Sequence, residues 1–109
     1  MSGPQFAAPL EVLSEGTATA VTVDGVDVAL VREGDDVFAI HDECSHAAIP
    51  LSEGEVEGCE IECWLHGSRF DARTGKALNL PATESVPTYP TTIQDGRILV
   101  DVSAPITQS

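Results

Sequence analysis

The chain has 109 residues, of which 42% are hydrophobic, and this length suits one globular domain spanning residues 1–109. Eighteen acidic residues against five basic ones give a net charge of -13. This charge disfavours nucleic acid and anionic membrane surfaces as partners, because both repel an acidic protein. The acidity either keeps the protein in solution or forms a docking surface for a basic protein partner.

The cellular compartment can be inferred from what the chain lacks. Its apolar runs are far shorter than the roughly 20 residues that span a bilayer, and the N-terminal stretch MSGPQFAAPLEVLSEG has no basic or hydrophobic targeting region. We therefore expect a soluble, cytoplasmic protein with no membrane segment. The three cysteines are odd in number and two stand close to histidines, which favours thiolate–metal bonding over a disulfide framework.

Short Val-rich segments predict antiparallel strands. In the first half these are residues 17–23, 26–32 and 36–40, separated by the turn signals DG and EGDD. Residues 85–93 and 97–102 flank a further turn, QDG, although Pro87 and Pro90 predict an edge strand or an irregular start. No segment has sustained helical periodicity, so the predicted fold class is all-β. The last residues, SAPITQS, are expected to fray.

Residues 41–82, between the strand-rich ends, predict an inserted, loop-rich subdomain, because Gly, Pro, Glu and the Cys/His pairs are concentrated there. Within it, EVEGCEIEC indicates a turn at Gly58 followed by a strand. Alternation along that strand places Cys59, Ile61 and Cys63 on one face, so Cys63 should point inward. Cys59 is interpreted as a small buried hydrophobic residue, and His41 as a surface or junction residue.

Four side chains form the candidate metal site. Cys44-x-His46 is followed, after sixteen residues, by Cys63-x-x-His66. A tetrahedral zinc site would use all four side chains on one ion, whereas a 2Fe–2S cluster would take the thiolates on one iron and the imidazoles on the other. Each pair carries one cysteine and one histidine, and this mixed order favours the cluster, since each loop can then supply one ligand to each iron.

The sequence resembles a known family. CSH, followed by CWLHGSRFDARTG and then LPA, is similar to the Rieske domain, and specifically to the small Rieske-type ferredoxins of bacterial ring-hydroxylating dioxygenase systems. The resemblance implies the Rieske fold, an antiparallel β sandwich with a cluster-binding subdomain at one tip. It also implies that Cys44 and Cys63 ligate a buried iron, and that His46 and His66 ligate an iron near the surface.

The ligand set determines the redox chemistry that the resemblance implies. Neutral imidazoles in place of two thiolates leave the oxidised cluster uncharged, which raises its reduction potential. Respiratory Rieske proteins carry two further cysteines, joined by a disulfide, and a serine and a tyrosine that donate hydrogen bonds to sulfur. This chain lacks the extra cysteines, keeps Ser68, and has Phe70 where the tyrosine would fall. The expected potential is therefore below that of the respiratory type.

Each residue near the ligands has two possible roles. Trp64 and Leu65 are interpreted as a hydrophobic cover for the cluster, with partner docking as a second use. Pro81 resembles the proline-containing loop that shields Rieske clusters, or else forms an ordinary turn. Three basic residues follow the second ligand pair: Arg69, Arg73 and Lys76. They are expected either to form salt bridges with carboxylates in the facing loop, which are Glu53, Glu55 and Glu57, or to contact a partner protein.

The function implied is one-electron transfer. The chain would accept an electron from a flavin-containing reductase and pass it to a terminal non-haem iron oxygenase, without catalysing a reaction alone. No arrangement of nucleophile, base and oxyanion donors is present in the sequence to suggest otherwise. Two alternatives remain open from the residues: a zinc-stabilised binding module, and an iron–sulfur redox sensor or assembly accessory that uses the same ligands.

Overall fold

The computed structural model describes residues 4–43, 49–63, 67–78, 85–103 and 105–106. No α-helix occurs in these ranges, which agrees with the predicted all-β class. The elements, in chain order, are β1 (Gln5–Pro9), the 3₁₀ turn η1 (Leu10–Val12), β2 (Ala18–Val23), β3 (Val26–Glu33), β4 (Asp36–His41), the 3₁₀ turn η2 (Leu51–Glu53), β5 (Val56–Glu57), β6 (Glu60–Glu62), β7 (Arg69–Asp71), β8 (Thr88–Tyr89), β9 (Thr91–Gln94) and β10 (Arg97–Val100).

The main sheet is antiparallel and has the order β2-β3-β4-β8. The β2–β3 hairpin turns at Asp24 and Gly25, whose φ angles of 50° and 78° are those of a tight two-residue hairpin loop. β3 is one of the two inner strands, and its residues from Val28 to Val31 are fully buried. The Val-rich segments therefore form the strands predicted from the sequence.

A second antiparallel sheet, of order β1-β10-β9, covers one face of the main sheet. The two sheets enclose one hydrophobic cluster, in which Leu30 and Ala39 of the main sheet pack with Ala8 and Ile98 of the covering sheet. This confirms the predicted β sandwich. β1 was not expected from its sequence, QFAAP, and its strand geometry comes from pairing with β10.

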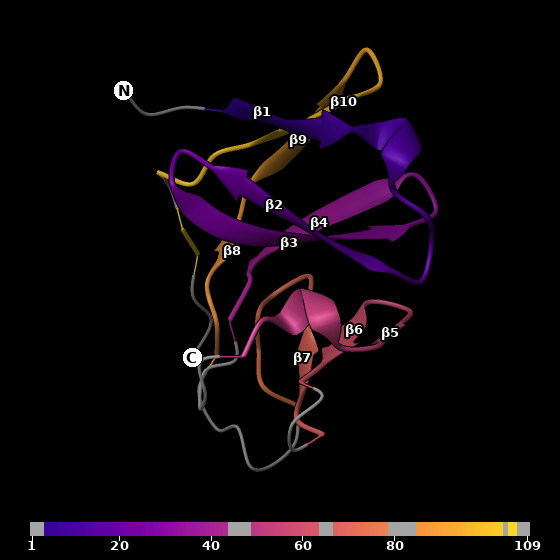
Figure 1. Cartoon of the computed structure of the whole chain (residues 1–109), viewed down its shortest axis with the longest axis vertical. Helices are drawn as coiled ribbons and strands as arrows, with labels where there is room; N and C mark the ends of the chain where they lie inside the picture. The colour runs from indigo at the N-terminus through magenta and orange to yellow at the C-terminus, as the bar shows by residue number, and fades with distance from the viewer. Residues whose placement is uncertain (1–3, 44–48, 64–66, 79–84, 104, 107–109) are drawn as a thin grey trace.

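The opposite face of the main sheet carries a small antiparallel sheet, of order β5-β6-β7. Figure 1 shows this small sheet at the end of the molecule that is farthest from β1 and β10. A second hydrophobic cluster joins the two parts, because Val31 and Ile40 of the main sheet pack with Leu51, Ile61 and Phe70. The small sheet thus packs on the main sheet through buried apolar side chains, and Cys63, directly after β6, belongs to the same cluster.

Two details of the C-terminal half differ from the sequence-based expectation. Pro90 divides the predicted strand 85–93 into β8 of the main sheet and β9 of the covering sheet, as a residue without a backbone donor should. The expected fraying of the C-terminal segment is wrong for Ile106, which forms an antiparallel bridge with Thr88 through two backbone hydrogen bonds of 2.8 Å. In the part of the chain that the structure describes, no helix is long and apolar enough to cross a membrane.

Candidate metal centre

Cys63 directly follows β6, and its side chain is fully buried. Alternation along the strand buries Ile61 and Cys63, while Glu60 is exposed and Glu62 half-buried. The predicted inward direction of Cys63 is therefore confirmed. Its thiol belongs to the hydrophobic cluster that joins the small sheet to the main sheet, so it is a soft sulfur donor in surroundings that exclude water.

The backbone closes on itself around Cys63. The Cys63 N–H donates to the carbonyl oxygen of Ser68 at 2.6 Å, and the Gly67 N–H donates to the carbonyl oxygen of Cys63 at 2.9 Å. Gly67 has a φ of 74°, in the left-handed region that glycine adopts without steric cost. These two bonds bring together the ends of the segment that contains His66, one of the predicted ligands.

Ser68 and Phe70, both predicted to lie near the metal, are fully buried. Phe70 pairs with Ile61 across the β6–β7 ladder and forms a bridge with Ala77. Both residues follow Cys63 on the return strand, so they are carried on the same small sheet. Phe70 has no hydroxyl, and it fills the cluster beside Ile61 purely by packing.

Three of the nine predicted site residues are therefore placed by the structure: Cys63, Ser68 and Phe70. The other six lie outside the described residues: Cys44, His46, Trp64, Leu65, His66 and Pro81. Within the described ranges, no group of three or more His, Cys, Asp or Glu side chains could hold a metal ion. The donor that can be tested, the buried thiol of Cys63, fits a sulfur-ligated metal group.

Cys59, in contrast, is not the buried strand residue that the alternation predicted. It lies in the β5–β6 turn and is only half-buried. Its Sγ atom donates to Oε2 of Glu33 at 2.7 Å, and its carbonyl oxygen accepts from Ala72 N–H at 2.7 Å. Burial, followed by the hydrogen bond and the charge of Glu33, raises the pKa of Cys59 to about 11. Cys59 therefore ties the small sheet to the end of β3 as a neutral thiol.

Two of the three basic residues, Arg69 and Arg73, pair with carboxylates other than those expected. Arg69 lies 3.4 Å from Glu60 and 3.8 Å from Glu62, both on the adjacent strand β6. Arg73 lies 3.0 Å from Asp71, and hydrogen bonds from Arg73 lower the pKa of that carboxyl group. The predicted partners in the facing loop were wrong because the β6–β7 register places Arg69 opposite Glu62. Residues 71–76 form a tight turn, in which the backbone N–H groups of Thr74 and Gly75 donate to the Asp71 carbonyl.

His41 ends β4, as expected for a residue at the junction with the inserted segment. The ring Nδ1 atom of His41 lies 3.3 Å from the hydroxyl of Tyr89. The backbone N–H of His41 donates to the carbonyl oxygen of Pro87 at 2.8 Å. Both partners are more than 45 positions away in the sequence. The sequence therefore gave no signal for them, and the contact follows from the β4–β8 pairing.

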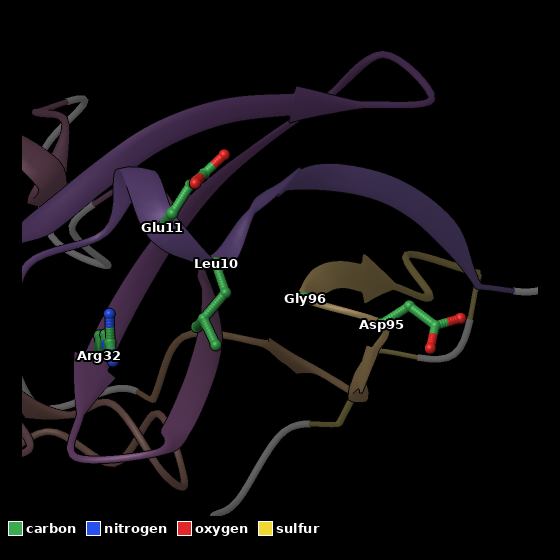
Figure 2. A pocket seen from close by; sticks show the side chains of 5 residues that line it. All are labelled: Leu10, Glu11, Arg32, Asp95 and Gly96. Atoms are coloured by element: carbon green, nitrogen blue, oxygen red, sulfur yellow. The ribbon is translucent and has the colours of Figure 1, made fainter.

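A hollow of about 350 Å³ lies elsewhere, lined by Leu10, Glu11, Arg32, Asp95 and Gly96 (Figure 2). None of these residues was predicted to belong to a site. The Arg32 guanidinium donates to the carbonyl oxygens of Gly34 and Leu13, each at 2.9 Å. Two donor groups of Arg32 thus bind backbone carbonyls. We therefore interpret Arg32 as a structural residue that holds the end of η1 against the β3–β4 turn.

Comparison with known proteins agrees with this geometry. Residues 3–90 match the model of the Rieske [2Fe-2S] domain. The ferredoxin component of the naphthalene 1,2-dioxygenase system of Pseudomonas putida is 41% identical over 97 residues, which cover 89% of this chain and 93% of that protein.

Two solved structures are similar over nearly their full length. The ferredoxin of carbazole 1,9a-dioxygenase from Nocardioides aromaticivorans is 44% identical, with a TM-score of 0.87 over 91% of this chain and 97% of that one. A complex of reduced oxygenase and oxidized ferredoxin in carbazole 1,9a-dioxygenase contains a chain that is 27% identical, with a TM-score of 0.86 over 97% of this chain and 96% of that one. The chain therefore belongs to the Rieske [2Fe-2S] domain family, and it is a ferredoxin that carries electrons on one Rieske-type 2Fe–2S cluster and is not catalytic alone.

Proposed function

We propose that the cluster is ligated by Cys44, His46, Cys63 and His66, the cysteines on the inner iron and the histidines on the outer iron. The observation that carries this assignment is the buried thiol of Cys63, held by a backbone closure immediately before the segment with His66. A cluster bound there would supply reversible one-electron transfer. The chain contributes a shell of apolar side chains that excludes water from the sulfur donor, and such a shell tunes the reduction potential of the group bound there.

We infer that the whole chain, residues 1–109, acts as one Rieske domain, with residues 41–82 as its cluster-binding subdomain. Trp64, Leu65 and Pro81 are proposed to cover the cluster, and Ser68 to donate a hydrogen bond to a cluster sulfur. The chain is proposed to work in the cytoplasm, because its thiols must stay reduced to bind iron.

We further propose the physiological partners: a flavin-containing reductase as electron donor and a terminal non-haem iron oxygenase as acceptor. The ferredoxin–oxygenase complex of carbazole 1,9a-dioxygenase and the naphthalene relative support the acceptor. The net charge of -13 supports a basic docking surface on at least one partner. A zinc-stabilised binding module is not favoured, since the family match implies an iron–sulfur cluster.

Reconstitution tests this assignment. The holoprotein is combined with a flavin-containing reductase and the terminal oxygenase of a ring-hydroxylating dioxygenase system, and substrate oxidation is followed as the ferredoxin concentration rises. Turnover should require the ferredoxin, and it should slow as ionic strength rises because salt screens electrostatic steering. Reduction of the ferredoxin without any transfer to an oxygenase would instead support a redox sensor or assembly accessory.

A further inference from the structure

Asp42 forms an unusual contact at the base of the first ligand loop. It follows β4 and is half-buried. Its Oδ1 atom accepts a hydrogen bond from the Ser52 N–H at 2.7 Å, and its Oδ2 atom accepts one from the Ser52 hydroxyl, also at 2.7 Å. Both oxygens of one carboxylate are therefore occupied by a single residue ten positions away. Bidentate, charge-assisted bonds of this kind are short and fix orientation as well as distance.

The two residues stand at opposite ends of one loop. Residues 43–51 leave the main sheet after Asp42 and return at Ser52, and this loop contains the proposed ligands Cys44 and His46. The Asp42 end is fixed further by a hydrogen bond from its N–H to the carbonyl of Asp27 at 3.1 Å. On the other side Leu51, the neighbour of Ser52, is fully buried. The Asp42–Ser52 contact therefore joins two ends of the loop, one bonded to the backbone of β3 and the other next to a core residue.

The returning end of the loop is also packed against the second ligand segment. Gly54 directly follows η2, and a Cβ atom at this position would overlap the carbonyl oxygen of Glu62. The Glu62 N–H donates to the carbonyl of Glu55 at 2.8 Å. Glu62 immediately precedes Cys63. The segment after Ser52 thus rests directly on the backbone that positions Cys63, so closing the first loop also sets its place relative to the second.

We propose that Asp42 and Ser52 are positioning residues that hold the first ligand loop in the geometry that retains the cluster. Closing a flexible loop costs conformational entropy, and the paired hydrogen bonds offset this cost at the loop base, where the ends must meet. Without them the two proposed ligands on the loop would sample a wider range of positions. This inference rests on the proposed ligand assignment.

The test compares three substitutions in the holoprotein. Asp42→Ala removes both bonds, Ser52→Ala removes only the hydroxyl bond, and Asp42→Asn retains an acceptor for the Ser52 N–H. Loss of visible absorbance is timed after warming or addition of an iron chelator, and the EPR spectrum of the reduced protein is recorded. Asp42→Ala should accelerate cluster loss about tenfold or more, Ser52→Ala by a smaller factor, and Asp42→Asn least.

The chain provides a matched control. Asp101 accepts hydrogen bonds from the N–H and the hydroxyl of Ser103, both on its Oδ1 atom, in an exposed turn where the two residues lie two positions apart. Asp101→Ala should leave both the rate of cluster loss and the EPR spectrum unchanged. A positioning role also requires that the EPR lines of intact Ser52→Ala protein broaden or shift, because a purely structural contact would change stability alone.

Three results would overturn the proposal: unchanged cluster retention in both Ser52→Ala and Asp42→Ala, an equal acceleration in Asp101→Ala, or unchanged EPR lines in intact Ser52→Ala protein. If Asp42→Ala does not fold, Ser52→Ala and Asp42→Asn still decide the outcome. Failure of the ligand assignment is recognised separately, because Cys44→Ala protein would then keep two irons and two sulfides per chain.

Discussion

The thiol of Cys59 and the carboxylate of Glu33 lie 2.7 Å apart, although 26 positions separate them in the sequence. Their contact joins the β5–β6 turn to the end of β3. Burial is the largest cause of the raised pKa of Cys59, which moves from 9.0 to about 11, and the hydrogen bond to Glu33 is the next. The thiolate is the reactive form of cysteine, so burial and the contact with Glu33 together lower the reactivity of Cys59.

Alkylation of the native protein tests this relationship. At pH 8 the thiolate population of Cys59, and with it the rate of reaction with iodoacetamide, should be about a hundredfold below that of an unperturbed thiol. Glu33→Gln removes the acceptor charge and should accelerate alkylation. Peptide mapping by mass spectrometry identifies the modified residue. Glu57→Gln is the control, since it removes a carboxylate from the same hairpin and leaves the Glu33 bond intact, and equal rates in the two variants would refute the role of Glu33.

The same pKa predicts a change of stability at alkaline pH. Because the folded-state pKa lies above the ordinary thiol pKa of 9.0, the contribution of Cys59 to the free energy of unfolding is fully present below about pH 9 and is lost between pH 9 and about 11. Cys59→Ser keeps a donor for Glu33 but does not titrate in this range. The difference in unfolding free energy between the wild-type protein and this variant should therefore change across that window, and a constant difference would contradict the assignment.

Phe70→Tyr restores the hydroxyl that the respiratory Rieske proteins carry. A new hydrogen bond to cluster sulfur would stabilise the more negative reduced form, and it should raise the reduction potential by roughly 60 mV for each 1.4 kcal/mol of difference. Protein-film voltammetry measures the potential directly. If the buried hydroxyl finds no partner, the potential will not move and the fold will lose about 1–3 kcal/mol, which would show that Phe70 does not face the cluster.

Gly54→Ala tests the close approach between the two ligand-bearing segments. The added Cβ atom would overlap the Glu62 carbonyl, so the segment must shift, at a cost of about 1–3 kcal/mol in the free energy of unfolding. Cluster content should fall as well. Gly25→Ala is the matched control, because a Cβ atom there meets nothing within 4 Å. Its φ of 78° costs about 1 kcal/mol, without loss of the cluster. Full cluster content in Gly54→Ala would argue against the close approach.

The sequence predicted the main sheet well, because Val-rich alternation and the Asp-Gly turns are local signals. β1 escaped prediction because QFAAP has little intrinsic strand preference and becomes a strand only through pairing with β10, where Ala8 lies opposite Ile98. The bridge between Ile106 and Thr88 also escaped prediction, because it is a long-range contact for which the residues around Ile106 carry no signal.

The residues of the candidate site likewise divide into those that local sequence could place and those that depend on long-range contacts. Alternation within EVEGCEIEC was sufficient to place Cys63 inward. It could not place Cys59, because the turn continues through that residue and releases it from the strand pattern. The ion pairs of Arg69 depend on the register of β6 and β7, which is set by the packing of both strands and by the loop between them, and not by the residues next to Arg69. Asp42 and Ser52 had no signal of their own, because their hydrogen bonds exist only once the loop between them has closed.

The central claim is that this chain carries one electron on a Rieske-type cluster held by two cysteines and two histidines. Reductive titration of the purified protein, with iron and acid-labile sulfide determined on the same sample, tests it most directly. The account predicts two irons and two sulfides per chain, uptake of one electron, and a rhombic EPR signal. A colourless protein that contains one zinc ion and takes up no electron would contradict it.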